Sequence, residues 1–193
     1  SLIPGTLYDY NVSATCMDGN TSYWSVDLSF ITLCNAITNA DLPYLENFDT
    51  YGTASGAFPD CWIRPIAYVS GTSTYPAIVT SPASSPSPVS STTSLRFQSK
   101  VAWAATPQLD VDIHTLRASF WLQKEGATSG SMQIGVMSDI SDTSTFEVVE
   151  TINLQEEDTW KFIEIFFDST QLAGTGNHIA LRQITTATNW FYW

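Results

Sequence analysis

From Tyr44 to its end, the chain consists of short segments rich in β-branched and aromatic residues, separated by glycine, serine, aspartate, asparagine and proline. No window in this part repeats its apolar residues with the 3.6-residue period of an amphipathic helix. Many short strands between turn residues are typical of antiparallel sheets packed face to face. We therefore expect an all-β fold, an antiparallel jelly-roll β-sandwich. The predicted strands are Leu95–Gln98, Thr115–Lys124, Gly130–Met137, Phe146–Asn153, Trp160–Asp168, Asn177–Ile184 and Asn189–Trp193.

The first part of the chain predicts a separate β-hairpin. Polarity alternates over Leu7–Met17 and again over Trp24–Leu33, and Asp18-Gly19-Asn20 between them favours a tight turn. The hairpin resembles the last two strands of a fibronectin type III domain, in the motifs Pro4-Gly5-Thr6-Leu7-Tyr8, Val12–Cys16, Ser22–Ser25 and Phe30-Ile31-Thr32. The resemblance implies a partial fibronectin type III β-hairpin. Because a lone hairpin is marginal in water, spacing and support are its expected roles.

The sequence predicts three parts. Residues 1–34 are the C-terminal part of a fibronectin type III domain, residues 35–41 are a linker, and residues 42–193 are the sandwich. The stretch Leu42–Pro65 is the expected entrance to the sandwich, with Glu46, Phe48 and Asp49 on its first core strand.

Three cysteines, Cys16, Cys34 and Cys61, match neither a zinc pattern nor a CxxC redox pair. One disulfide and one buried thiol is the simplest arrangement. We expect Cys34 to pair with Cys61, which would tie the linker to the entrance of the sandwich. A reducing compartment would instead leave three free thiols.

The charge balance bears on the choice of partner. The chain has 7 basic and 19 acidic residues, which gives a net charge of -12. Such a chain repels a phosphate backbone and an anionic membrane surface, so nucleic acid is not an expected partner. No apolar run approaches the roughly 18 to 20 residues that cross a bilayer, so no direct membrane span is expected.

The segment Ser70–Thr93 consists largely of serine, threonine, proline and alanine. It has little apolar area to bury, and proline disrupts regular strand pairing. We expect a long exposed loop here. A loop that contacts a ligand is the functional alternative, because long loops in compact domains are often functional.

From Cys34 onward, the order of motifs resembles the MAM-like β-sandwich of secreted and surface proteins of the Bacteroidota, and is similar to the cleaved-adhesin domains of gingipain-type haemagglutinins. The resemblance rests on Glu46-x-Phe48-Asp49, on Pro59-x-Cys61-Trp62 and on the segment Gly135–Phe146. Family members close with a further strand carrying an Asp pair after an aromatic run, and this chain stops at Trp193, before that strand.

The resemblance implies a non-catalytic extracellular or cell-surface binding module, for adhesion or carbohydrate binding, in a larger secreted or surface protein. Its expected partners are a glycan or a host or cell-surface protein, together with neighbouring domains of the same parent chain. A structural spacer or assembly domain is the alternative, because a fold does not decide a ligand.

Catalysis has little support in the sequence. His114 and His178 lie in no HExxH motif and beside no GxSxG elbow. Glu147, Glu150, Glu164 and Asp168 lie on predicted strands and could form the carboxylate pair of a glycoside hydrolase. A sandwich offers many such pairs by chance, so we expect no enzyme.

Calcium is the cofactor that the sequence suggests. Glu46 and Asp49 could supply carboxylate oxygens at the entrance of the sandwich. The resemblance to adhesin domains, which hold structural calcium, implies the same ion here. Asp139 and Asp142 in the SDISDTS turn are a second acidic pair, for which we favour an ordinary turn role.

Glycan binding would use an exposed aromatic side chain among polar ones. Alternation along Thr115–Lys124 turns Trp121 away from Leu116, Ala118, Phe120 and Leu122. We therefore predict a polar ligand face that carries Trp121, Gln133, His178 and Arg182, with Trp103, in the expected loop Lys100–Thr106, as a second exposed aromatic residue. The alternative is that Trp121 packs beneath the serine-rich segment or against the hairpin.

Overall fold

The structure, a computed structural model, describes residues 2–81, 92–98, 100–125, 130–154, 159–168, 172, 176–184 and 189–192. The chain divides into two compact units, Ser1–Asn35 and Ala36–Trp193.

The first unit is a β-hairpin whose strands are shorter than predicted. Strands β1 (Leu7–Tyr10) and β2 (Leu28–Ile31) pair antiparallel, with the rings of Tyr8 and Phe30 stacked at 5.9 Å. Beyond the strands, serine side chains replace backbone acceptors, since Val12 N donates to Ser25 Oγ and Ala14 N to Ser22 Oγ, both at 2.9 Å. Such side-chain acceptors compete with a regular ladder, which explains the short strands.

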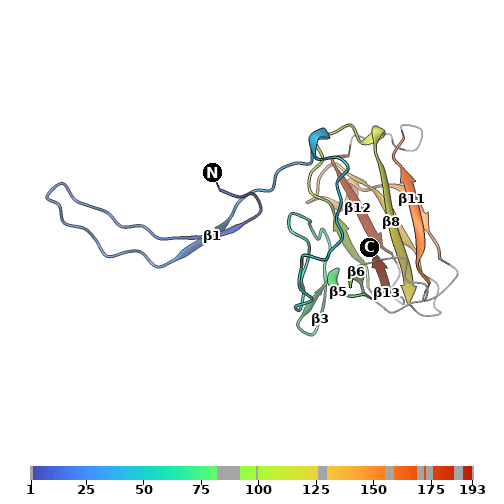
Figure 1. Ribbon diagram of the computed structural model, residues 1–193, viewed down its shortest axis with the longest axis horizontal. Helices are drawn as coiled ribbons and strands as arrows, with labels where there is room; N and C mark the ends of the chain where they lie inside the picture. The colour runs from blue at the N-terminus through green and yellow to red at the C-terminus, as the bar shows by residue number, and fades with distance from the viewer. Residues whose placement is uncertain are drawn as a thin grey trace. The chain divides into compact units, whose positions relative to one another are not determined.

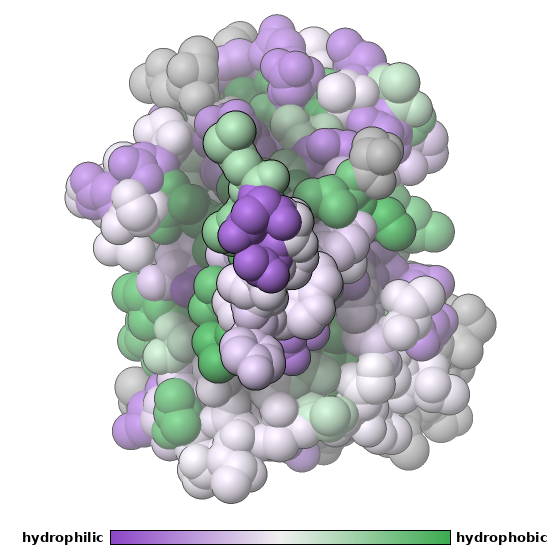
Figure 2. All heavy atoms as spheres, turned by 90° about the vertical axis from the view of Figure 1, so that its left-hand side faces the viewer, coloured by the Kyte–Doolittle hydropathy of each residue, from purple (hydrophilic) through white to green (hydrophobic). Residues whose placement is uncertain are grey.

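Large apolar side chains lie on the surface of the hairpin unit. Tyr23 is 98% exposed, Leu33 90% and Trp24 66%. Figure 2 shows apolar residues, in green, reaching the surface of the protein among polar ones. The hairpin unit therefore gains little stability from burial of its own apolar area.

The second unit is built on two antiparallel sheets (Figure 1). The five-stranded sheet has the order β11-β8-β13-β6-β5, and the four-stranded sheet has the order β10-β9-β12-β7. The five-stranded sheet comprises β5 (Ala77–Thr80), β6 (Thr93–Phe97), β8 (Arg117–Glu125), β11 (Lys161–Phe166) and β13 (Asn189–Tyr192). The four-stranded sheet comprises β7 (Ala102–Ala105), β9 (Met132–Met137), β10 (Glu147–Ile152) and β12 (His178–Gln183).

Smaller elements accompany the sheets. Strands β3 (Tyr68–Ser70) and β4 (Ser73–Tyr75) form a hairpin. The described residues also contain the short 3₁₀ helices η1 (Asn39–Asp41), η2 (Ile113–Thr115) and η3 (Thr143–Thr145).

The topology confirms the expected antiparallel jelly roll. From β6 to β13 the chain changes sheet at every step except between β9 and β10. Strand β12 lies between β7 and β9, and β13 lies between β6 and β8. Late strands that return between early ones are the feature of paired Greek keys, the arrangement of a jelly roll.

The core lies between the two sheets. Leu95, Phe97 and Leu122 of the five-stranded sheet are fully buried, as are Met132 and Ala104 of the four-stranded sheet. Because successive side chains of a strand point to opposite faces, the residues between these positions point outward. The outer faces are therefore where a ligand could bind.

Three local expectations are wrong. Strands β4 and β5 lie within the predicted loop Ser70–Thr93, because Pro76 stands between the two strands and β5 is at the edge of its sheet, so no ladder is interrupted. Trp103 lies on β7, not in a loop. No strand runs through Glu46–Asp49, where Phe48 has a φ of 60° that no strand allows. Residues 82–91 of the serine-rich segment lie outside the described residues.

Candidate functional site

The candidate site is the outer face of the five-stranded sheet along β8 and β11, side by side in Figure 1. On β8, Ala118, Phe120 and Leu122 pack into the core, so the side chains between them point outward. On β11, Ile163 and Ile165 pack into the core in the same way. The outward residues are Arg117, Ser119 and Trp121 on β8 and Phe162, Glu164 and Phe166 on β11, which we call the aromatic face.

Strand register sets these residues opposite one another. Trp121 pairs with Phe162, Ser119 with Glu164, and Arg117 with Phe166. The rings of Trp121 and Phe162 meet edge to face, with centroids 5.4 Å apart. Arg117 Nη1 donates to Glu164 Oε1 at 3.1 Å, an exposed ion pair in the middle of the face.

Two phenylalanines of the aromatic face are exposed to solvent, Phe162 and Phe166, each at 54%. They lie four residues apart on one strand, so about 13 Å separates them along β11. Trp121 is half-buried, because it packs against the buried Trp160, as Val79 also does. The face therefore presents two aromatic surfaces separated by polar groups.

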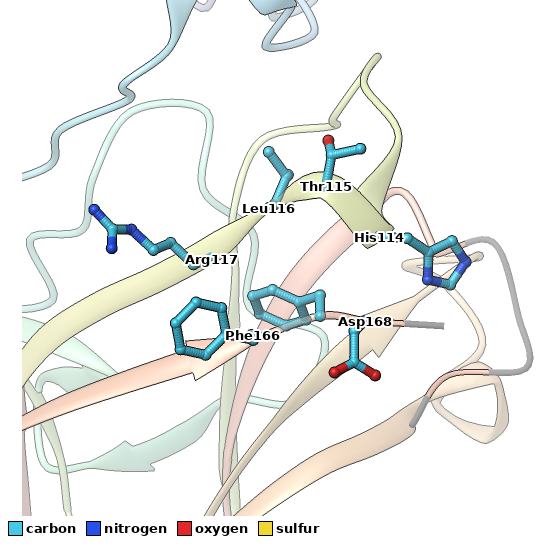
Figure 3. Close-up of a pocket in the computed structure, with 7 residues that line it drawn as sticks. His114, Thr115, Leu116, Arg117, Phe166 and Asp168 are labelled. Carbon is cyan, nitrogen blue, oxygen red and sulfur yellow. The ribbon is translucent and has the colours of Figure 1, made fainter. Parts of the chain in front are cut away.

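A pocket of about 320 Å³ opens at one end of the aromatic face. Figure 3 shows Phe166 at the end of β11 and Asp168 just after it, with His114 on the far side of Asp168 from Phe166. The pocket is lined by His114, Thr115, Leu116, Arg117, Phe166, Phe167 and Asp168. Aromatic, cationic, anionic and hydroxyl groups thus converge on a space large enough for a small ligand.

Of the residues predicted to share a face with Trp121, none lies on its sheet. Gln133 is on β9, and His178 and Arg182 are on β12, both in the four-stranded sheet, whereas β8 belongs to the five-stranded sheet. The predicted single face is therefore wrong, because alternation along one strand cannot tell which sheet the strand joins.

The structure brings two of those residues, Gln133 and Arg182, together with Trp103, the second predicted aromatic residue. Arg182 lies opposite Trp103 on β7 and opposite Gln133 on β9. Trp103 is only 3% exposed, so its ring offers no open surface for a ligand. His178 is also buried, with Nδ1 2.9 Å from the Thr106 carbonyl oxygen, and its contacts are those of a packed strand residue.

The two predicted calcium ligands are already hydrogen-bonded within the protein. Glu46 Oε1 accepts from Phe48 N at 2.8 Å and Oε2 from the Tyr51 hydroxyl at 3.1 Å, while Asp49 Oδ1 accepts from Thr93 Oγ1 at 3.2 Å. Burial, with a smaller contribution from the negative charge of Asp60, raises the pKa of Glu46 above its ordinary value. A bound cation would have the opposite effect on that pKa.

No metal-binding group of three His, Cys, Asp or Glu side chains forms within the described part of the chain. The donor set around Glu46 does not by itself complete the six to eight oxygens that calcium takes. Calcium at Glu46 and Asp49 stays a prediction. In the SDISDTS turn, Asp139 Oδ1 accepts from Ser141 N at 2.8 Å and Asp142 caps η3.

The cysteines have the states that the expected pairing requires. Cys34 and Cys61 are disulfide-bonded, whereas Cys16 is a free thiol. Cys16 is exposed, and the expectation that the third thiol is buried is wrong. Its neighbours form the exposed turn of the hairpin, which has no core to bury it.

The predicted sites omitted Phe162 and Phe166. The signal was present in Lys161–Phe166, where aromatic residues stand on the face opposite Ile163 and Ile165. Their exposure depends on what covers that face, which the sequence of one strand does not state.

No helix within the described residues is long and apolar enough to cross a membrane.

The fold and its aromatic face define the chain as an antiparallel β-sandwich module. No protein-family model matches the sequence, and no curated protein matches it either. Among solved structures, the K1 cleaved adhesin domain of Lys-gingipain from Porphyromonas gingivalis W83 is similar, with a TM-score of 0.51 and 16% identity, over 76% of this chain and 90% of that chain.

Two further structures are less similar. The K3 cleaved adhesin domain of Lys-gingipain from the same organism has a TM-score of 0.42 and 14% identity, over 53% of this chain and 71% of that chain. A family 16 carbohydrate-binding module has a TM-score of 0.34 and 13% identity, over 52% and 72%. The likeness in fold rests on the K1 domain alone.

Proposed function

We propose that the protein is a non-catalytic extracellular module that binds carbohydrate on the aromatic face of its five-stranded sheet. The observation that carries the proposal is the pair of exposed rings, Phe162 and Phe166, on one strand of the five-stranded sheet. Aromatic rings with polar groups between them suit a sugar chain, whose rings have apolar faces and hydroxyl edges.

The polar groups of the face support the same ligand class. Arg117 and Glu164 lie between the two rings, and the pocket beside Phe166 adds His114, Thr115 and Asp168. An oligosaccharide that contacts both phenylalanines would span about 13 Å along β11, so its terminal unit would reach the pocket. The K1 domain that shares the fold is described as a cleaved adhesin, which agrees with a binding role.

An extracellular location is part of the proposal. Cys34 and Cys61 are disulfide-bonded, and structural disulfides persist mainly in oxidising compartments. The parent protein would present the module beside its neighbouring domains, with a glycan or a surface protein as partner.

A glycan array on the protein tests the proposal. The wild type is expected to bind a defined set of glycans that the double variant Phe162→Ala, Phe166→Ala no longer binds. Trp121→Ala should weaken binding as well, because Trp121 supports Phe162. Tyr23→Ala is the matched control, since Tyr23 is an exposed aromatic residue on the hairpin unit.

Two results would contradict carbohydrate binding. One is an array with no bound glycan, and the other is binding that the double variant retains. If the wild type instead self-associates in sedimentation experiments and the double variant stays monomeric, the same rings serve assembly. That outcome would favour the structural or assembly role.

A further inference from the structure

The arginines of the chain differ in how their charge is compensated. Arg96 lies 3.6 Å from Glu125, and Arg117 lies 3.1 Å from Glu164. Arg64 donates to the carbonyl oxygens of Pro76 and Gly56, both at 2.7 Å. Arg182 is different, because no carboxylate in the described part of the chain lies within ion-pair distance of it.

The guanidinium of Arg182 is nevertheless held in a fixed position. It lies 4.9 Å from the centroid of the Trp103 ring and 4.6 Å from that of Phe146, and these two rings meet edge to face at 5.0 Å. Arg182 Nε donates to Gln133 Oε1 at 2.9 Å, and Nη2 donates to the same oxygen. Gln133 is fixed in turn, since its Nε2 donates to Thr151 Oγ1 at 3.1 Å.

Gly135 makes room for this arrangement. A Cβ at this position would collide with the Glu147 carbonyl oxygen and would lie 2.9 Å from Phe146 Cζ. Without a side chain at Gly135, the Phe146 ring approaches the sheet and contacts both Trp103 and Arg182. The outer face of the four-stranded sheet is thus shaped to hold one guanidinium.

Within the described residues, most of the hydrogen-bonding capacity of Arg182 is unused. A guanidinium has five N–H donors, and Gln133 accepts from one on Nε and one on Nη2. Nη1 donates to no group among the described residues. Burial lowers the pKa of Arg182, and no acidic partner among the described residues offsets this cost. A planar ligand group with two acceptor oxygens would use the free donors and compensate the charge.

We propose that Arg182 binds the carboxylate of an acidic sugar unit, on the outer face of the four-stranded sheet. The proposal rests on the proposed function, carbohydrate binding, and adds a second contact with a stated chemistry. Thr151 beside Gln133 is exposed and can hydrogen-bond a sugar hydroxyl. A lone uronate on a neutral glycan is the favoured ligand, because a net charge of -12 repels a densely charged polyanion.

The test compares two sugars that differ in one group. A glucuronate-containing disaccharide and its neutral glucose counterpart are titrated into the protein by calorimetry, and a galacturonate pair is measured in the same way. The wild type is expected to bind the uronate form roughly tenfold or more tightly, the size of one charge-assisted contact. The preference should shrink as salt concentration rises.

Variants test whether Arg182 causes the preference for the uronate form over the neutral form. Arg182→Met is expected to abolish it, and Arg182→Lys to reduce it, because lysine keeps the charge but has no planar fork. Lys100→Met is the matched control, since it removes one positive charge from an exposed position and should keep the preference. If thermal melting shows that Arg182→Met does not fold, Arg182→Lys decides.

Equal affinity of the wild type for both sugars, or no binding of either uronate, overturns the proposal. A preference that persists in folded Arg182→Met, or that is undiminished in folded Arg182→Lys, overturns it as well. The proposed function is judged separately, by loss of array binding in the Phe162→Ala, Phe166→Ala variant. One combination of results is that the double variant loses array binding while the Arg182 variants keep the full preference for the uronate form. That combination supports the proposed function and rejects this inference.

Discussion

Phe48 shows how tertiary contacts override local preference at a single residue. Its φ of 60° is one that bulky side chains rarely adopt, and such a conformation costs about 1–3 kcal/mol. Its backbone is held on both sides, because Glu46 Oε1 accepts from its N–H and Thr93 Oγ1 donates to its carbonyl oxygen. Its side chain is 4% exposed and packs edge to face on Trp62. Burial and these hydrogen bonds compensate for the strained φ.

Tyr51 predicts a loss of stability in alkaline solution. Burial, the negative charge of Glu46 and the hydrogen bond to it raise the pKa of Tyr51 from 10.0 to about 12. The folded protein therefore keeps this proton at a pH where the unfolded chain loses it, and stability falls as pH rises from 10 towards 12. Urea unfolding across this range should show a smaller fall for Tyr51→Phe than for the wild type. Parallel profiles for the two proteins would contradict the prediction.

The close packing around Gly135 predicts that adding one methyl group there lowers the stability of the fold. The Cβ of Gly135→Ala would collide with the Glu147 carbonyl oxygen and press on the Phe146 ring, so either the β9–β10 pair or the ring must move. We expect a destabilisation of about 1–3 kcal/mol, typical of overpacking. Urea unfolding measures it. In the control Gly52→Ala, the new Cβ has its nearest neighbour at 4.0 Å, so stability should not change. Equal stability of both variants would contradict the prediction, because it would show that the sheet accommodates the added methyl group without loss of stability.

At the scale of elements, alternation predicted the direction of side chains well. Along β11, Ile163 and Ile165 are in the core and Phe162 and Phe166 are outside, as a period of two requires. Strand β7 was missed because Ala102, Trp103, Ala104 and Ala105 show no alternation: all four are buried. Both faces of β7 are covered, and such strands lack the polar signal that marks a half-buried strand.

The hairpin of β1 and β2 predicts fast hydrogen exchange. Its residues are mostly exposed, and a two-stranded ribbon has no further strand to protect its amides. Strand β12 pairs on both sides, with β7 and β9. Exchange followed by mass spectrometry should label peptides from residues 2–33 well before those from β12. Equal protection would mean that the hairpin is covered in solution.

At the scale of the whole molecule, the predicted Cys34–Cys61 disulfide bond can be tested by chemical labelling. Alkylation of the denatured, unreduced protein should add one label, on Cys16, because Cys34 and Cys61 are disulfide-bonded. Peptide mapping after proteolysis should recover Cys34 and Cys61 in one linked species. Labelling of all three cysteines would reject the bond.

Calcium at Glu46 and Asp49 predicts a change in thermal stability on chelation. A cation that binds the folded state alone raises its stability by mass action, so a chelator should lower the melting temperature. Glu46→Gln should abolish that response, because it removes one carboxylate ligand. Identical melting curves with calcium and with chelator would contradict a structural ion.

The sequence by itself determined the fold class and the inward or outward direction of many side chains. Both follow from local patterns, since period-two alternation and turn residues act over a few positions. It also suggested which cysteines pair and which motifs resemble adhesin domains.

Only the tertiary structure decided which outward residues share a surface. Trp121 meets Phe162 because β8 pairs with β11, whereas Gln133, Arg182 and Trp103 meet because β9, β12 and β7 are neighbours in the other sheet. These pairings join residues tens of positions apart, and the competition among all strands for partners selects them. A pattern within one strand contains no information about that competition.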